Sequence, residues 1–264
     1  MPLNTPIKDW SNKRVWIIGA STGIGEALAK QLSHAGARLF ISARSKDKLE
    51  LLAGALNATR ALPFDMTHEA AVAHAAETVF AEWGGVDVVV VMAGTYVEMR
   101  AQNFNLAAAK HQVEVNINGV LNVLAPVLPK LIKQGSGHIS LVSSVAGYSG
   151  LPNGMIYGAS KAALINMAEA LFVDLSENNV DVSLVCPGFV ETPLTAKNEF
   201  PMPFIITVEE AANAMVDSFA RGDFEMHFPR KFTRILKFLR LLPYTLYFAA
   251  VKKTTGMGGK NARG

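Results

Sequence analysis

Residues 14–25 read RVWIIGASTGIG, an apolar run that passes directly into a turn with three glycines. A short apolar run that ends in glycine is typical of a buried strand. Gly19, Gly23 and Gly25 allow a tight turn and the close approach of a pyrophosphate, and a helix after the turn would offer free backbone N–H groups. The spacing G-x-x-x-G-x-G differs from the usual G-x-G-x-x-G and is by itself a weak signal. Between an expected strand and an expected helix, it predicts a dinucleotide-binding turn.

The rest of the chain repeats the alternation of strand and helix. The run 86–94, VDVVVVMAG, is rich in β-branched residues, as a strand buried on both faces would be. Further strands are expected at 37–44, 59–65, 137–144, 181–188 and 224–229, and helices at 26–36, 45–56, 68–84, 105–133, 155–177 and 207–222. The pattern predicts an α/β fold, a Rossmann-like doubly wound parallel sheet of about seven strands with helices on both faces.

The composition limits the class of protein. With 50% hydrophobic and 18% charged residues, the chain can form a sizeable core and is not disordered. The single cysteine, Cys186, excludes an internal disulfide, and its apolar neighbours predict a buried thiol. No signal peptide stands out, and no uncharged apolar run reaches the roughly 20 residues of a spanning helix. We therefore expect a cytoplasmic protein, with neither a metal site nor a nucleic-acid partner.

The end of the second expected strand indicates which dinucleotide would bind. An NAD site usually has an acidic residue about 20 positions after the glycine turn, bonded to the ribose 2′-hydroxyl. Here Arg44 and Ser45 stand at that place, where a guanidinium would meet a 2′-phosphate. The alternative is a solvated arginine at a strand end, but the missing acid favours NADP(H) over NAD(H). Asp65, which ends the third strand, is expected to accept a hydrogen bond from the adenine amino group or to cap the next helix.

Six motifs follow one another along the chain. They are GASTGIG (19–25), FDMT (64–67), VNING (115–119), LVSSVAG (141–147), YGASK (157–161) and CPGFVETPL (186–194). In this order and spacing the sequence resembles the single-domain short-chain dehydrogenases/reductases, over residues 13 to about 225. The resemblance implies a single nucleotide-binding and catalytic domain over 1–229. It also implies hydride transfer between a nicotinamide and a carbonyl or alcohol, and a homodimer or homotetramer.

Tyr157 and Lys161 are four residues apart and therefore share one face of a helix. A free phenol has a pKa of about 10 and exchanges protons poorly near pH 7. An ammonium one turn away would stabilise the phenolate by its charge. The resemblance implies that Tyr157 is the general acid/base and that Lys161 assists it and hydrogen-bonds the nicotinamide ribose. Two residues of an ordinary amphipathic helix would show the same spacing. The presence of the other motifs favours the catalytic interpretation.

Two more catalytic residues are implied by the resemblance. Ser144 would hold the substrate oxygen and polarise the carbonyl, and Asn116 would keep a water in line behind Lys161. Ser143 and Asn118 are chemically equal neighbours, so only the spacing of the family selects Ser144 and Asn116. Further cofactor-binding residues implied in this way are Ser21, Thr22, Ile24, Met66, Ala93, Gly94, Pro187, Gly188, Val190 and Thr192.

One motif departs from the pattern of the family. The N-N-A-G run that usually follows the fourth strand is VMAG at 91–94. The small pair Ala93 and Gly94, which lets the ribose approach, is kept. The asparagines that tie neighbouring strands are replaced by Val91 and Met92, so we expect cofactor binding to survive with different sheet hydrogen bonding.

The expected walls of the substrate pocket are apolar. They are Val145, Tyr148, Pro152, Met155, Phe189 and Leu194, with Ser144 and Tyr157 at the reacting oxygen. The segment 198–206 is expected to lie over the pocket as a lid and offers Phe200, Met202, Phe204 and Ile205. Because no arginine or lysine is expected there to hold a carboxylate or phosphate, a lipophilic carbonyl or alcohol is the expected substrate.

The last segment, 230–264, differs in character from the body. After Glu225 the chain has nine basic residues and no acidic one, although the whole chain carries only +3. On a helical wheel, the apolar and the basic side chains lie on opposite sides of the segment up to Pro243. The segment is expected either to lie on an anionic membrane surface through 230–253 or to pack on the body or a second subunit.

One alternative to an enzyme remains for the whole chain. It could be a catalytically idle NADP(H) sensor or a membrane-docked binding protein on the same fold. Such a protein would not need a proton relay.

Overall fold

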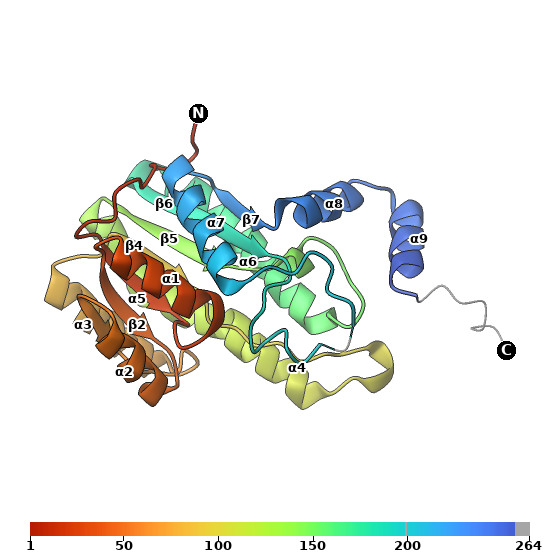
Figure 1. Ribbon diagram of the computed structural model, residues 1–264, viewed down its shortest axis with the longest axis horizontal. Coiled ribbons are helices and arrows are strands. Elements are labelled where there is room, and N and C mark those ends of the chain that lie inside the picture. The colour runs from red at the N-terminus through yellow and green to blue at the C-terminus, as the bar shows by residue number, and fades with distance from the viewer. Residues whose placement is uncertain (199, 257–264) are drawn as a thin grey trace.

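The computed structural model describes residues 1–198 and 200–256. Its centre is a seven-stranded parallel sheet with the order β3-β2-β1-β4-β5-β6-β7 (Figure 1). The strands are β1 Arg14–Ile18, β2 Arg38–Ser42, β3 Thr59–Ala61, β4 Val88–Val91, β5 Gly137–Val142, β6 Val180–Pro187 and β7 Glu225–Phe228. The order reverses between β1 and β4, and in open α/β sheets a ligand crevice lies beyond the carboxyl ends of the strands at such a point.

Helices cover both faces of the sheet and confirm the doubly wound prediction. One face carries α1 (Gly23–His34), α2 (Lys46–Ala55) and α7 (Val208–Arg221), which lie in front of the sheet in Figure 1. The other carries α3 (Glu69–Trp83), α5 (Gly119–Gln134) and α6 (Met155–Asp174). Each face has its own apolar core, and Cys186 is buried in the second one, as predicted.

Strand β4 shows why the sheet is buried on both sides. Its four valines are 0–2% exposed and alternate between the two cores. Val88 and Val90 face the α1–α7 side, while Val89 and Val91 face the α5–α6 side. The continuous β-branched run therefore has no polar face, as the sequence predicted.

One long helix crosses the back of the sheet. It consists of α4 (Leu106–Val113), a π-helical turn (Glu114–Asn118) and α5. By length and composition alone this stretch could cross a membrane. In the fold its buried residues, such as Val123 and Val127, belong to the core under the sheet, so core packing accounts for its apolar composition.

The predicted C-terminal segment forms two helices after β7. They are α8 (Arg230–Arg240) and α9 (Tyr244–Thr254), separated at Pro243, and they extend away from the sheet at one end of the molecule (Figure 1). Residues 257–264, the end of the predicted segment, lie outside the described residues, as does Glu199 in the expected lid.

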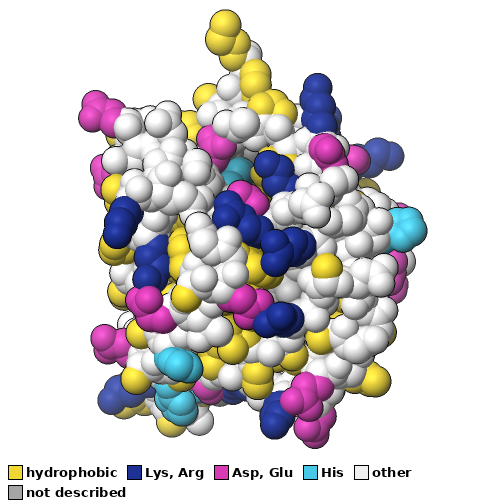
Figure 2. Space-filling view, turned by 90° about the vertical axis from the view of Figure 1, so that its left-hand side faces the viewer, with side chains coloured by type: hydrophobic (Ala, Val, Ile, Leu, Met, Phe, Trp, Pro, Cys, Tyr) yellow, Lys and Arg dark blue, Asp and Glu magenta, His cyan; other side chains and the backbone are white. Residues whose placement is uncertain are grey.

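The opposite end of the molecule has a mixed surface. Figure 2 shows this side, where Lys and Arg side chains lie among Asp and Glu side chains. The amino ends of β1 and β4 meet here, and Arg14 Nη2 lies 2.8 Å from Asp87 Oδ1. Several basic side chains of the body thus have an acidic partner nearby, whereas in α8 and α9, within the part of the chain that the structure describes, only Lys237 forms an ion pair.

Candidate active site

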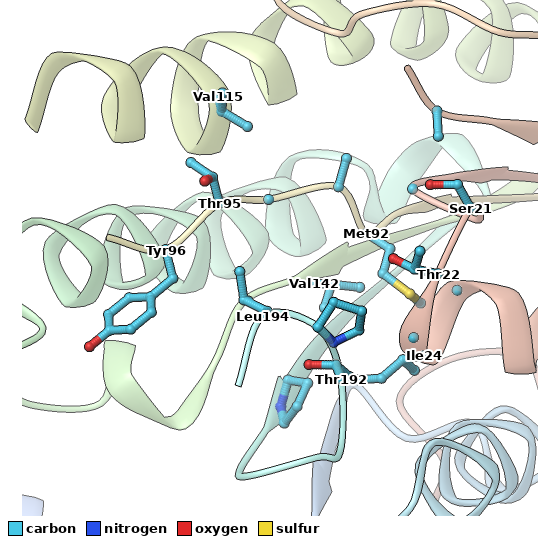
Figure 3. A pocket seen from close by; sticks show the side chains of 18 of the residues that line it. Ser21, Thr22, Ile24, Met92, Thr95, Tyr96, Val115, Val142, Thr192 and Leu194 are labelled. Carbon is cyan, nitrogen blue, oxygen red and sulfur yellow. The ribbon is translucent and has the colours of Figure 1, made fainter. Parts of the chain in front are cut away.

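A cleft of ≈ 440 Å³ lies beyond the carboxyl ends of the central strands. Residues that follow β1, β2, β4, β5 and β6 line it, together with the start of α6. Figure 3 shows Ser21 and Thr22 at one end of the cleft, Tyr96 towards the other, and Thr192 and Leu194 between them. The cleft therefore lies at the reversal point of the sheet, where the strand order places a ligand site.

The glycine turn forms the first end of the cleft. A Cβ on Gly25 would lie 2.2 Å from the carbonyl oxygen of Gly19, and one on Gly19 would lie 2.5 Å from the nitrogen of Ala93. Gly19 also has φ +103°, in the left-handed region that favours glycine. The Thr22 side chain makes no capping bond to α1, so the first N–H groups of the helix remain for a ligand. The turn has the shape and the donors of an anion cradle.

Arg44, Ser45, Asp65 and Met66 line the same cleft on the side of β2 and β3. Arg44 Nη1 lies 4.0 Å from Asp65 Oδ2, and the Arg44 side chain is 67% exposed. Asp65 Oδ1 accepts hydrogen bonds from the Thr67 N–H (3.0 Å) and hydroxyl (2.8 Å). Burial opposes ionisation of Asp65, but these bonds and the charge of Arg44 lower its pKa. One Asp65 oxygen thus closes the turn before α3, while the other faces Arg44.

Tyr157 lies in the first turn of α6 and borders the middle of the cleft. Burial raises the pKa of Tyr157, and the hydrogen bond of its hydroxyl with Ser144 acts in the opposite direction. The Tyr96 ring stands edge-on to the Tyr157 ring, with centroids 5.0 Å apart. With a raised pKa, the Tyr157 phenol keeps its proton near neutral pH, as a proton donor must.

Lys161 lies one turn further along α6 and is 4% exposed. Its Nζ donates to the Val142 carbonyl at 2.9 Å and lies 5.8 Å from the centroid of the Tyr157 ring. Burial lowers the pKa of Lys161 to about 8. A Cβ placed on Gly94 would be 3.3 Å from both Lys161 Nζ and Asn116 Oδ1. Both polar groups therefore border the space that this glycine leaves open.

Asn116 occupies the π-helical turn of the long helix and is fully buried. Its amide donates to the Thr95 carbonyl (2.9 Å) and the Ser160 hydroxyl (3.0 Å), and accepts from the Thr95 N–H (2.8 Å). It does not line the cleft itself but fixes the loop after β4. The competing Asn118 is exposed and donates to Glu114 Oε2 at 2.6 Å, so it is directed away from the site.

The two neighbouring serines that follow β5 have different hydrogen-bond partners. The Ser143 hydroxyl donates to the carbonyl of Lys161 at 2.7 Å and so ties β5 to α6. The Ser144 hydroxyl interacts with Tyr157 and accepts from the Ala146 N–H at 3.1 Å. Both border the cleft, but only Ser144 is directed at the phenol.

The sequence model of the short chain dehydrogenase family matches residues 13–201 of this chain. The chain belongs to this family. An uncharacterized oxidoreductase of Myxococcus xanthus is 33% identical over 249 residues, which are 93% of this chain and 98% of that protein. This short chain dehydrogenase is therefore an oxidoreductase with the seven-stranded fold of its family.

Solved structures share this fold. A short chain dehydrogenase from Burkholderia cenocepacia in complex with NADP has a TM-score of 0.81 and 24% identity, and the match covers 92% of this chain and 98% of that chain. A 3-ketoacyl-(acyl-carrier-protein) reductase from Brucella melitensis complexed with NADH has a TM-score of 0.75 and 26% identity, covering 83% and 97%. Solved structures with this fold thus include one with NADP and one with NADH.

The loop after β6 is held by its own hydrogen bonds. Pro187, Gly188, Val190 and Thr192 line the cleft, as expected for the cofactor side. The Thr195 hydroxyl donates to the Val190 carbonyl at 2.5 Å and accepts from the Thr192 N–H at 3.0 Å. These bonds hold Thr192 opposite the glycine turn of the dehydrogenase.

At the departure in 91–94 the backbone is bonded to β1. The N–H groups of Met92 and Ala93 both donate to the Ile18 carbonyl, at 2.8 and 3.0 Å, and keep β4 tied to β1. The Met92 side chain lies beside Thr22 at the nucleotide end of the cleft (Figure 3). Here the dehydrogenase has a thioether where its family usually has an amide.

The expected substrate wall needs correction. Val145 and Tyr148 are 6% and 7% exposed and belong to the core, because a 3-10 turn after Ser144 directs them beneath the site. The Tyr148 hydroxyl donates to Glu225 Oε1 at 2.5 Å, which fixes it there. Of the six residues expected as walls, Leu194 is the one that lines the cleft.

Two other expected wall residues are used differently. Met155 begins α6 and is 41% exposed, outside the lining of the cleft. Phe189 stacks on Phe232 of α8, with ring centroids 5.4 Å apart and planes at 28°. Since α8 follows the last strand of the family fold, nothing in the motif around Phe189 pointed to this partner.

Several lining residues were missed from the sequence, and two of them, Tyr96 and Lys197, bear on the chemistry. Tyr96 follows the β4 motif by two residues, and burial, with smaller effects of Glu98 and Tyr157, raises its pKa to about 12. Lys197 lines the cleft on the loop after β6, just before the segment in which no cation was expected. The position of Tyr96 just after a strand end was a usable signal, whereas no local pattern marked Lys197.

Proposed function

We propose that this dehydrogenase uses NADPH to reduce a carbonyl group on a substrate with an apolar body, with Tyr157 as the proton donor. One observation carries the proposal. The phenol of Tyr157 faces the Ser144 hydroxyl inside the cleft, with the buried Lys161 one turn further along α6. This is the arrangement that a general acid needs beside a polarised oxygen.

The residues of the cleft fit a nicotinamide dinucleotide. The cradle at Gly19 and Gly25, which no Cβ could share, suits the pyrophosphate, and Arg44 suits a 2′-phosphate. Lys161 and Gly94 lie where a ribose would pack, and Thr192 lies beyond β6, where the carboxamide would meet it. When bound, NADPH supplies the hydride.

The proton is handled by the protein. Ser144 would hold the carbonyl oxygen, and Tyr157 would donate its proton to that oxygen as the carbonyl carbon is reduced. The ammonium of Lys161 would stabilise the phenolate left behind, and it is charged below its pKa of about 8. Asn116 holds the Thr95 loop beside this pair, where a water could return the proton from solvent. In this scheme the catalytic role of Asn116 is positional.

The far end of the cleft supports an apolar substrate body. Tyr96 lies there, Leu194 lies between it and the glycine turn, and Val142 also lines the cleft (Figure 3). Lys197 adds a cation to the lining of the cleft. Its effect on substrate preference can be measured with two matched ketones, one that ends in a methyl group and one that ends in a carboxylate. For an apolar substrate, kcat/KM should be higher with the methyl ketone. Preference for the carboxylate would assign substrate binding to Lys197 instead.

The test is NADPH oxidation with a panel of apolar ketones and aldehydes, comparing wild type with Tyr157→Phe. The variant should lose about 10²- to 10⁴-fold in kcat and still bind NADPH. Tyr244→Phe, a tyrosine 78% exposed on α9, is the control and should turn over normally. Unaltered turnover by Tyr157→Phe would refute the assignment. Tight NADPH binding with no turnover of any carbonyl would favour an idle sensor.

The long helix supports a homodimer or homotetramer. Four large apolar residues along it are exposed: Leu106 (58%), Val113 (37%), Leu121 (46%) and Ile132 (42%). Pairing of this helix with a second copy would bury them. Sedimentation velocity should show a dimer or tetramer that Leu121→Glu weakens, and a monomeric wild type would contradict this.

A further inference from the structure

The two C-terminal helices expose an unusual amount of apolar surface. Six large side chains on α8, the following turn and α9 form what we call the C-terminal patch: Ile235 (50% exposed), Phe238 (64%), Leu241 (81%), Tyr244 (78%), Leu246 (56%) and Phe248 (50%). Single exposed apolar residues are ordinary, but a group of this size marks a binding surface.

The exposure of the C-terminal patch does not mean that α8 and α9 lack contacts with the body. The other side of α8 is already docked, because Phe232 and Leu236 pack on the core and the Thr233 hydroxyl lies 2.6 Å from His227 Nδ1. Helix α9 is fixed by Tyr247, whose hydroxyl donates to the Gly150 carbonyl at 2.8 Å, and by the buried Val251. Each helix therefore binds the body with one side and leaves the C-terminal patch outward.

The charges around the patch have one sign. The described residues after Glu225 include seven basic side chains and no acidic one: Arg230, Lys231, Arg234, Lys237, Arg240, Lys252 and Lys253. Within residues 1–198 and 200–256, Lys237 is the member of this set that forms an ion pair, with Glu225. Two cations at the end of α9 and several along α8 thus flank exposed apolar groups, unlike the mixed surface in Figure 2.

We propose that α8 and α9 bind an anionic lipid surface, with the C-terminal patch inserted at the interface and the basic residues on the headgroups. This chemistry satisfies both features at once, since interfacial helices combine an apolar face with Lys and Arg. A symmetric contact with a second copy would bring two surfaces of the same positive charge together, and α8 and α9 have no acidic side chain to pair with the cations. Such like-charge contacts oppose pairing, whereas anionic headgroups neutralise the cations.

The surface adjoins Phe204, in the segment expected to form a lid. Phe232 of α8 stacks on Phe189 and also on Phe204, with a centroid distance of 6.1 Å to the latter, and Phe204 is 49% exposed. Docking would thus bring Phe189 and Phe204, close to the loop that lines the cleft, towards the membrane, where an apolar substrate partitions. This consequence rests on the proposed function, while the docking itself does not.

Vesicle flotation of the full chain tests the docking without any turnover. Wild type should float with vesicles of phosphatidylcholine and phosphatidylserine, float much less with phosphatidylcholine alone, and be released by salt. Arg234→Gln/Arg240→Gln should lower partitioning about fivefold per charge. Phe238→Ser/Leu241→Ser should lower it about tenfold or more. Circular dichroism and NADPH affinity, unchanged in each variant, show that the fold is intact.

Helix α2 offers matched controls. Leu51 is 77% exposed, close to the value for Leu241, and the Lys46 side chain is 66% exposed. Leu51→Ser and Lys46→Gln should float like wild type. Failure of wild type to float, or equal flotation of wild type and the patch variants, would overturn the proposal. A third result would also overturn it: wild type binds no vesicles but forms a dimer in their absence, and Phe238→Ser/Leu241→Ser dissociates that dimer. A second copy of the chain would then cover the C-terminal patch.

Discussion

Replacing Arg44 by Gln tests which dinucleotide the cleft selects. Arg44 lies at the rim of the cleft with its side chain 67% exposed, and its Nη1 is 4.0 Å from Asp65 Oδ2. An exposed ion pair adds about 0–1 kcal/mol to stability, so Arg44→Gln should leave the free energy of unfolding nearly unchanged. A hydrogen bond between a guanidinium and a phosphate contributes about 1.5–3 kcal/mol. The variant therefore separates cofactor binding from folding.

The expected effect falls on NADPH alone. A loss of about 1.5–3 kcal/mol corresponds to a rise of about 10- to 150-fold in the Kd for NADPH. NADH has no 2′-phosphate, so its Kd should change by less than about threefold. Both constants can be measured by titrating the fluorescence of the reduced nicotinamide, with initial rates on one ketone as a second readout.

Lys46→Gln is the control for a general charge effect. Lys46 begins α2, two residues after Arg44, its side chain is 66% exposed, and its Nζ lies 3.7 Å from Glu50 Oε1. Removing this charge should alter both dissociation constants only slightly. Equal weakening of NADPH and NADH in Arg44→Gln, or the same effect in both variants, would refute the contact with the 2′-phosphate.

Three further changes test the site and the core. Burial lowers the pKa of Lys161 to about 8, so its charge is lost as pH rises through that value. The kcat/KM for carbonyl reduction should fall about tenfold per unit above it, and a level profile to about pH 10 would contradict the charge partnership with Tyr157. Gly25→Ala should abolish NADPH binding, because its Cβ would lie 2.2 Å from the Gly19 oxygen, whereas Gly54→Ala has open space and should bind normally; wild-type affinity in Gly25→Ala would show that the turn is not the cradle. Tyr148→Phe loses its bond to Glu225 and should cost about 1–3 kcal/mol in urea unfolding with kcat/KM unchanged; a changed KM at unchanged stability would return Tyr148 to the pocket wall.

The nucleotide side of the cleft could be predicted from the sequence because backbone geometry decides it. Gly19 and Gly25 stand where a Cβ has no room, and this requirement is local to a short stretch between a strand and a helix. The same holds for Tyr157 and Lys161, whose spacing on one helix determines their face. These residues were expected to meet in one cleft, and they do.

The substrate side depends on contacts between distant segments. Tyr148 is not part of the pocket wall because its hydroxyl donates a hydrogen bond to Glu225, which is 77 residues away in the sequence. Phe189 stacks on Phe232, which lies on a helix that the motifs of the family do not cover. Lys197 reached the rim through the path of a loop without regular structure. Spacing along the chain contains no information on such pairs, so the pocket wall could not be predicted residue by residue.

The hydride itself can be followed. NADPH with deuterium at C4 of the nicotinamide, prepared as each of its two stereoisomers, is incubated with an apolar ketone, and the mass of the alcohol is measured. With wild type, one stereoisomer should give alcohol with one deuterium on the carbinol carbon, and Tyr157→Phe should give almost none while still binding NADPH. Unlabelled alcohol from both stereoisomers, or labelled alcohol from Tyr157→Phe at the wild-type rate, would contradict hydride transfer assisted by Tyr157.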